Sequence, residues 1–184
     1  MLYNHCIRKK GKPKIMLLNF KLKNFKSFKN ETIFTMLSSM QKTHHDYVFR
    51  RSICGNKIRV LPMAVIYGAN ASGKSNIILA MNILRIMIRE GTLNCKKLDP
   101  YKSTLSFIHD SSWYQPVELE ITFSTLDNIY RYGIEFTDID SYSIVKEYLY
   151  INNDEIFERT KENKIQIPIN SLVKKGYIDK NEEN

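Results

Sequence analysis

One stretch of eight residues has the composition and spacing of a loop that binds phosphate groups. Residues 68–75 are GANASGKS and match the pattern G-x-x-x-x-G-K-[ST] at every fixed position. Glycine at the first and sixth positions, Gly68 and Gly73, permits backbone angles and close approaches that a side chain would block. Consecutive backbone N–H groups can therefore point at phosphate oxygens. The positive end of a following helix reinforces that attraction.

Two side chains at the end of this phosphate-binding loop (P-loop) complete a site for a nucleoside triphosphate and its metal ion. Lys74 is placed to neutralise charge on the β- and γ-phosphates, and Ser75 offers a hydroxyl to Mg²⁺. ATP and Mg²⁺ are the expected cofactors, with Ser75 as the protein's metal ligand. The residues expected to bind the nucleotide are Gly68, Asn70, Ala71, Ser72, Gly73, Lys74, Ser75 and Asn76. The sequence assigns no catalytic residue.

The segments on either side of the loop have the patterns that such a site needs. Residues 61–67 form a short apolar run that predicts a strand buried on both faces, with Pro62 near its start. Residues 75–90 have apolar side chains at positions 77, 78, 81, 84, 87 and 88, which is the spacing of a helix face. Gly91 follows as an expected C-terminal cap. A strand, a loop and a helix thus follow one another in the order that the motif requires.

Alternation of apolar and polar residues predicts a sheet around this unit. Residues 18–22 and 32–36 predict one hairpin, followed by a long polar loop over residues 38–59. The other expected strands are 117–123 and 130–136 around a turn at 125–128, 144–151 and 156–159 around Asn152-Asn153-Asp154, and a short last strand near 165–169. The expected fold class is therefore α/β, a mixed sheet with a P-loop helix and an antiparallel β-hairpin subregion.

Other residues that could carry chemistry have weaker patterns. His44 and His45 are adjacent, so they point in different directions, and no partner lies at ligand spacing. The pair Asp154-Glu155 follows Asn152 and Asn153 rather than an apolar strand, so a hairpin tip is expected there instead of a catalytic acid. Three widely spaced cysteines predict reduced thiols rather than a disulfide or zinc framework: Cys6, Cys54 and Cys95.

Composition and charge limit the classes of protein. The chain has 184 residues, 43% apolar and 11% aromatic, which suits one globular domain. No apolar run is long enough for a membrane span, and a cytoplasmic protein without a membrane partner is expected. The net charge is +9, but residues 1–74 hold fifteen Lys and Arg against two acidic residues, Glu31 and Asp46. This basic half could attract a nucleotide or nucleic acid, or include a solvated tail.

Four stretches carry a resemblance to a known group of ATPases. They are LLNFKLKNFKSFKNETIFTM (residues 17–36), LPMAVIYGANASGKSN (61–76), YRYGIEF (130–136) and KEYLYINNDEIFER (146–159). Together they resemble the N-terminal part of ABC-type ATPases of the RecF, SMC and OLD group, and most of all the AAA-domain ATPases of bacterial anti-phage and abortive-infection systems. The resemblance implies a P-loop NTPase lobe in which residues 24–28 lie near the nucleotide base. It also implies that two ATP-binding heads dimerise around nucleotide and regulate DNA binding or a partner nuclease.

The chain departs from that group after the P-loop helix. Intact members have a signature loop, an acidic pair that holds magnesium and activates water, and a switch histidine. The acidic pair would be expected as Asp-Glu after four apolar residues, and residues 75–184 contain no such pattern. The resemblance therefore implies an N-terminal lobe over residues 16–170, with a basic tail at 1–15 and a polar tail at 171–184. ATP hydrolysis, which needs further metal ligands and a group that orients the nucleophile, is expected to depend on a C-terminal half or a second ATPase head.

Two other classes of function stay open at this stage. A small-molecule kinase would need an acceptor site and an arginine-bearing lid. The sequence after Gly91 is instead rich in predicted strands, and its only arginines are Arg131 and Arg159. A non-catalytic interaction module would use the basic residues 1–59 to contact DNA while the P-loop is vestigial. Salt-dependent DNA binding without ATP would favour that module.

Overall fold

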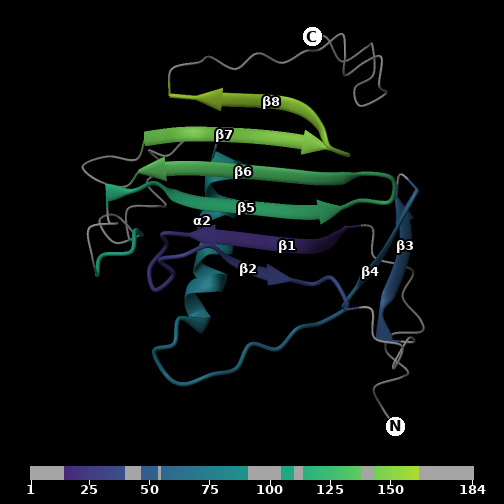
Figure 1. Ribbon diagram of the computed structural model, residues 1–184, viewed down its shortest axis with the longest axis horizontal. Coiled ribbons are helices and arrows are strands. Elements are labelled where there is room, and N and C mark those ends of the chain that lie inside the picture. Colours follow the sequence, from purple (N-terminus) through teal and green to yellow (C-terminus); the bar gives the residue numbers. More distant parts are fainter. Residues whose placement is uncertain are drawn as a thin grey trace.

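The centre of the molecule is a six-stranded sheet with a helix on one face. The computed structural model describes residues 15–39, 47–53, 55–90, 105–109, 114–137 and 143–161 (Figure 1). Within these residues the sheet order is β2-β1-β5-β6-β7-β8, and each pair of neighbours is antiparallel. The strands are β1 (Met16–Lys23), β2 (Thr32–Thr35), β5 (Val117–Ser124), β6 (Ile129–Thr137), β7 (Ser143–Ile151) and β8 (Asp154–Thr160). A helix on a sheet fits the α/β class, but no parallel pair of a mixed sheet occurs in the described part of the chain.

Strand β1 forms because its residues alternate and because strands lie on both sides of it. Leu18, Phe20 and Leu22 are buried, while the residues between them are half-buried. It pairs with β2 along one edge and with β5 along the other. A period of two places every second side chain on the same face of a sheet, so β1 gives one face to the core and the other to charged residues.

Helix α2 (Lys74–Glu90) covers the apolar face of the sheet. It lies behind β1, β5 and β6 in the view of Figure 1. Its buried side chains recur with helical spacing and pack against apolar residues of these three strands. The helix residues are Ile77, Ala80, Ile83, Leu84, Ile86 and Met87, and the strand residues are Phe20, Leu22, Val117, Leu119, Ile134 and Phe136. The helix predicted for residues 75–90 is therefore confirmed, with the core on its inner side.

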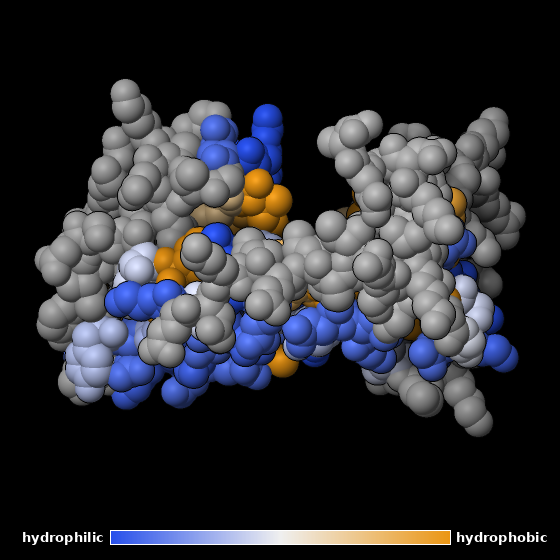
Figure 2. All heavy atoms as spheres, turned by 90° about the horizontal axis from the view of Figure 1, so that it is seen from above, coloured by the Kyte–Doolittle hydropathy of each residue, from blue (hydrophilic) through white to orange (hydrophobic). Residues whose placement is uncertain are grey.

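The opposite face of the sheet is polar. Lys23 Nζ lies 2.6 Å from Glu118 Oε1, and Lys146 Nζ lies 3.1 Å from Glu158 Oε2. Tyr148 lies across Gly133, where an added Cβ would overlap its ring, and its hydroxyl donates to Glu120. Figure 2 shows the hydrophilic residues in a band along this face and hydrophobic residues toward the helix side. Burial and charge therefore separate the two faces.

The hairpins expected from the alternating segments are present. β5 and β6 pair from Val117–Phe136 to Ser124–Ile129, around a turn at residues 125–128. β7 and β8 are joined through Asn152 and Asn153, which both have positive φ, as a tight two-residue turn requires. Asp154 begins β8, which confirms the hairpin-tip interpretation of the Asp154-Glu155 pair. Asn152 also accepts a hydrogen bond from the Ile129 backbone N–H at 2.8 Å, which links the two hairpins.

The long loop expected over residues 38–59 is wrong in part, because this segment contains a second, two-stranded sheet. Strands β3 (Phe49–Ile53) and β4 (Asn56–Val60) form a hairpin. Its apolar side, with Phe49, Ile58 and Val60, packs near Met16 and Leu18 of β1. The basic residues between the apolar ones concealed an alternation with only five residues in each strand.

The strand predicted for residues 61–67 is also wrong. This segment continues from β4, donates one hydrogen bond from Leu61 N to Met36 O, and then runs outside the sheet to α2, below β2 in Figure 1. Val65 is 72% exposed and Tyr67 is 90% exposed, so the segment is not buried on either face. Apolar composition favours a strand, but a strand needs a neighbour with which to exchange backbone hydrogen bonds.

Several sequence predictions lie outside the described residues. They concern residues 1–14 of the basic tail predicted at 1–15, the cysteines Cys6, Cys54 and Cys95, the histidines His44 and His45, the Gly91 cap, the strand near 165–169 and the polar tail at 171–184. Among the residues that are described, no helix combines the length and apolar character needed to cross a membrane.

Candidate nucleotide-binding site

The P-loop, residues 68–75, is a turn that joins the exposed 61–67 segment to the first residue of α2. Ala71 has φ of +61° and Gly73 has φ of +87°, so the backbone passes twice through the left-handed region. Glycine adopts that region without steric cost. A Cβ at position 73 would also overlap the Ser27 hydroxyl and approach the Phe28 ring. Glycine at position 73 is therefore required both by backbone conformation and by a neighbouring segment.

The Lys74 ammonium lies within the loop that precedes it. Its Nζ donates to the Gly68 carbonyl at 2.9 Å and to the Ala69 carbonyl, and it lies 3.4 Å from the Ser72 hydroxyl. An ammonium has three donors, and these three oxygens account for all of them. The loop thereby holds a positive charge at its centre, where it can be shared with an anion.

The N-terminus of α2 adds further positive potential to the loop. The helix begins at Lys74, so Ser75 and Asn76 lie in its first turn, and that turn contains no acidic residue. Free N–H groups and the helix dipole make such an end attractive to phosphate. Ser75 is exposed, so its hydroxyl is accessible to a metal ion. A hydroxyl oxygen beside a phosphate site is a suitable ligand for Mg²⁺, which takes oxygen ligands.

The turn after β1 lies against the P-loop. The sequence patterns did not indicate which residues make this contact. Asn76 Nδ2 donates to Ser27 Oγ at 3.0 Å, and Ser27 and Phe28 are the residues that a Cβ added at Gly73 would meet. The structure thus brings Ser27 and Phe28 of the 24–28 segment to the P-loop. Asn24 and Lys26 both have positive φ, which shapes the turn. Asparagine tolerates positive φ and favours turns, so Asn24 at the end of a predicted strand is the sequence signal that could have indicated a tight turn here.

Asn24 anchors this turn to the sheet. The Asn24 side chain is 2% exposed, and its Nδ2 donates to the Gln115 carbonyl at 2.6 Å. Phe25 is completely buried, and the Phe25 and Phe28 backbones exchange hydrogen bonds across the turn. A buried amide that is hydrogen-bonded to backbone fixes its segment in one arrangement. The position of the P-loop is therefore coupled to the core through Ser27.

The described residues contain no other arrangement that could hold a metal ion through acidic or sulfur ligands. No group of three His, Cys, Asp or Glu side chains is close enough for that purpose among them. The expected metal ligand, Ser75, belongs to a different type of site, in which Mg²⁺ is held by one hydroxyl, waters and the phosphates of the nucleotide. The residues of the loop are suited to that type.

Residues 68–75 thus form a complete P-loop pattern that ends at a helix N-terminus, although the described residues 61–67 directly before it form no strand. Residues 63–175 match the model of the family described as "AAA domain, putative AbiEii toxin, Type IV TA system". This match spans more than half of the 184 residues, and the chain belongs to that family, an AAA-type P-loop ATPase-like domain. No curated protein matches the chain.

Proposed function

We propose that this chain binds Mg-ATP through residues 68–75, as the N-terminal part of an ATPase. The observation that carries the proposal is the complete P-loop at the start of α2, with the Lys74 ammonium held among the loop's own oxygens. Membership of an AAA family supports a nucleotide as the ligand. Oxygens of the β- and γ-phosphates would take the place of the loop oxygens around Lys74 Nζ.

The proposal assigns roles to the second half of the loop and to the residue after it. Lys74 neutralises phosphate charge, and Ser75 holds Mg²⁺. The backbone N–H groups of residues 70–74 surround the phosphates, and Asn76 keeps Ser27 against the loop. The Mg²⁺ that Ser75 would hold would neutralise phosphate charge and so reduce repulsion toward a nucleophile. Residues 24–28 lie near the nucleotide base in this proposal, which the closeness of Ser27 and Phe28 to Gly73 supports.

We further propose that residues 16–170 are the N-terminal lobe of an ABC-type ATPase of the RecF, SMC and OLD group, completed by a C-terminal half or a second ATPase head. The exposed apolar residues beside the P-loop support this, because Val65 and Tyr67 are 72% and 90% exposed. Ile78 on the outer side of α2 is 60% exposed. Monomeric proteins seldom leave such surfaces contiguous unless they form an interface. Strands from a second part, added beside residues 61–67, would cover them.

Hydrolysis in this proposal depends on that second part, which supplies the acidic residues that activate water. ATP turnover then controls DNA binding or a partner nuclease. The P-loop of this chain supplies binding and charge neutralisation only, because phosphoryl transfer also needs a group that positions the attacking water.

Nucleotide affinity of a charge-matched pair of variants tests the proposal. Lys74→Ala removes one positive charge from the loop, whereas Arg85→Ala removes one from an exposed position on the same helix. Losing a charged hydrogen-bonding partner costs about 1.5–3 kcal/mol, so Lys74→Ala should weaken Mg-ATP binding by about tenfold or more. Arg85→Ala should leave it unchanged. Equal affinity of Lys74→Ala and the parent chain, measured by calorimetry, would contradict the assignment.

A further inference from the structure

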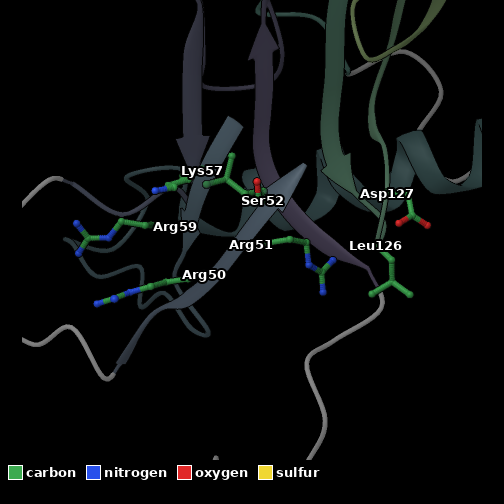
Figure 3. Close-up of a pocket in the computed structure, with 8 residues that line it drawn as sticks. Arg50, Arg51, Ser52, Lys57, Arg59, Leu126 and Asp127 are labelled. Carbon is green, nitrogen blue, oxygen red and sulfur yellow. The ribbon is translucent and has the colours of Figure 1, made fainter. Parts of the chain in front are cut away.

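The β3–β4 hairpin has one face on which cationic side chains gather. Arg50 pairs directly with Arg59, and Ser52 with Lys57, so these four residues share a face of the two-stranded ribbon. Residues 47–60 contain four Lys and Arg and no acidic residue. Arg50 and Lys57 are exposed. Figure 3 shows Arg50, Lys57 and Arg59 extending from the ribbon to the same side, whereas Arg51 extends to the other.

The opposite face of the hairpin fixes this cationic face in place. Phe49, Ile58 and Val60 pack in the cluster around Met16 and Leu18. Arg51 Nη1 donates to the Thr125 carbonyl at 2.7 Å, which ties the hairpin to the β5–β6 turn. A ligand would therefore meet cations whose backbone is already ordered, and this lowers the entropic cost of binding.

The hairpin and the β5–β6 turn line a cavity of about 800 Å³, in which the cations outnumber the acids. Arg50, Lys57 and Arg59 of the cationic face line it, whereas Arg51 extends toward the side of Leu126 and Asp127 (Figure 3). Ile58 and Leu126 add apolar lining.

We propose that the cationic face of the β3–β4 hairpin binds the phosphodiester backbone of a nucleic acid. Arginine presents a planar fork of donors that matches phosphate oxygens in a bidentate manner. A two-stranded ribbon is narrow enough to enter a nucleic-acid groove, and it carries its charges in a row. The family match begins at residue 63, so these two strands precede the matched segment. They also lie away from the start of α2 in Figure 1. The proposal does not depend on ATP binding.

Salt-dependent binding of the full chain to a fluorescein-labelled oligonucleotide tests this surface, with single-stranded and duplex probes measured side by side. The triple variant Arg50→Ala/Lys57→Ala/Arg59→Ala should weaken binding by about tenfold or more. It should also reduce the slope of log affinity against log salt by about 2 to 3, because each lost phosphate contact removes nearly one unit. The milder Arg50→Gln variant should reduce the slope by about 1 and keep the hairpin intact.

A second triple variant separates this surface from net charge alone. Arg85→Ala/Arg89→Ala/Lys161→Ala removes the same number of cations from exposed positions elsewhere, and it should keep most of the affinity and slope. Lys74→Ala should bind the oligonucleotide like the parent chain, which separates a failure here from a failure at the ATP site. Equal losses in both triple variants would overturn the proposal. Equally effective displacement by polyglutamate would also overturn it, because an acidic peptide would then be as good a ligand.

Discussion

Strand β1 and the segment 61–67 are both rich in branched and aromatic apolar residues, yet one is buried and the other is exposed. Phe20 and Leu22 in β1 have no exposed surface, whereas Val65 is 72% exposed and Tyr67 is 90% exposed. The two segments are joined to the same helix–sheet unit. β1 lies between β2 and β5, and residues 61–67 pass outside the sheet on the way to α2 (Figure 1).

The difference shows that apolar composition selects strand-forming segments but does not supply their neighbours. β1 exchanges backbone hydrogen bonds with β2, which is near in sequence, and with β5, which is distant. Its alternation directs one set of its side chains to the face that α2 covers. Residues 61–67 have a composition that suits burial on both faces. Our account is that the strands which would cover those faces belong to a second part of the ATPase.

The largest expected effect contrasts one residue from each segment. Phe20→Ala should lower the free energy of unfolding by about 3–5 kcal/mol, because it removes a fully buried aromatic ring and leaves a cavity. Val65→Ser should change it by no more than about 0.5 kcal/mol, because an exposed side chain has little burial to lose. Urea unfolding measures both. A Val65→Ser loss as large as that of Phe20→Ala would show that residues 61–67 are buried within this chain.

A smaller effect tests how firmly the P-loop is held against the core. Gly55 and Gly73 both have positive φ, but a Cβ meets nothing within 4 Å at Gly55 and overlaps Ser27 at Gly73. Gly55→Ala should cost about 1–2 kcal/mol from backbone strain alone. Gly73→Ala should cost about 1–3 kcal/mol more from overpacking.

The control for this contact is the double variant Gly73→Ala/Ser27→Ala. It removes the hydroxyl that the new methyl group would meet, so it should recover part of the extra loss. Equal destabilisation by Gly55→Ala and Gly73→Ala in urea unfolding would show that the P-loop does not pack on the turn after β1. The P-loop would then be as exposed as residues 61–67.

The smallest effects concern two carboxylates on the polar face of the sheet. Burial, followed by the charge of Glu118, raises the pKa of Glu135 above its ordinary value. The folded state therefore binds this proton more tightly than the unfolded state, and stability falls as pH rises from the unfolded pKa to the raised one. Glu135→Gln should stabilise the protein at neutral pH by less than about 1 kcal/mol, and the gain should disappear in acid.

A second carboxylate on the same face provides the opposite sign. Glu158 forms an ion pair with Lys146, and the hydrogen bond between them is the main cause that raises the pKa of Lys146. Glu158→Gln should therefore lower stability slightly, by about 0–1 kcal/mol, since the pair is partly exposed. Thermal unfolding followed across pH compares the two variants. A loss of stability in Glu135→Gln at neutral pH would show that its ion contacts with lysines outweigh its burial.

Sequence patterns predicted the elements whose partners are local. The hairpins around residues 125–128 and 152–153 and the helix after the P-loop follow from alternation, turn residues and helical spacing. The β3–β4 hairpin was missed because its strands are short and its outward residues are basic. The strand at 61–67 was overpredicted because burial depends on distant partners. Within the candidate site, the motif by itself proposes Lys74 as the phosphate contact and Ser75 as the metal ligand. The Ser27 contact depends on tertiary packing that no local pattern reports.

The most direct test of the central claim is the affinity of the purified chain for ATP with and without Mg²⁺, measured together with ATP turnover. Our account predicts magnesium-dependent binding that is lost in Lys74→Ala, and turnover no higher than in that variant. An absence of ATP binding would contradict the nucleotide site. Robust turnover by this chain alone would contradict the claim that hydrolysis depends on a second part.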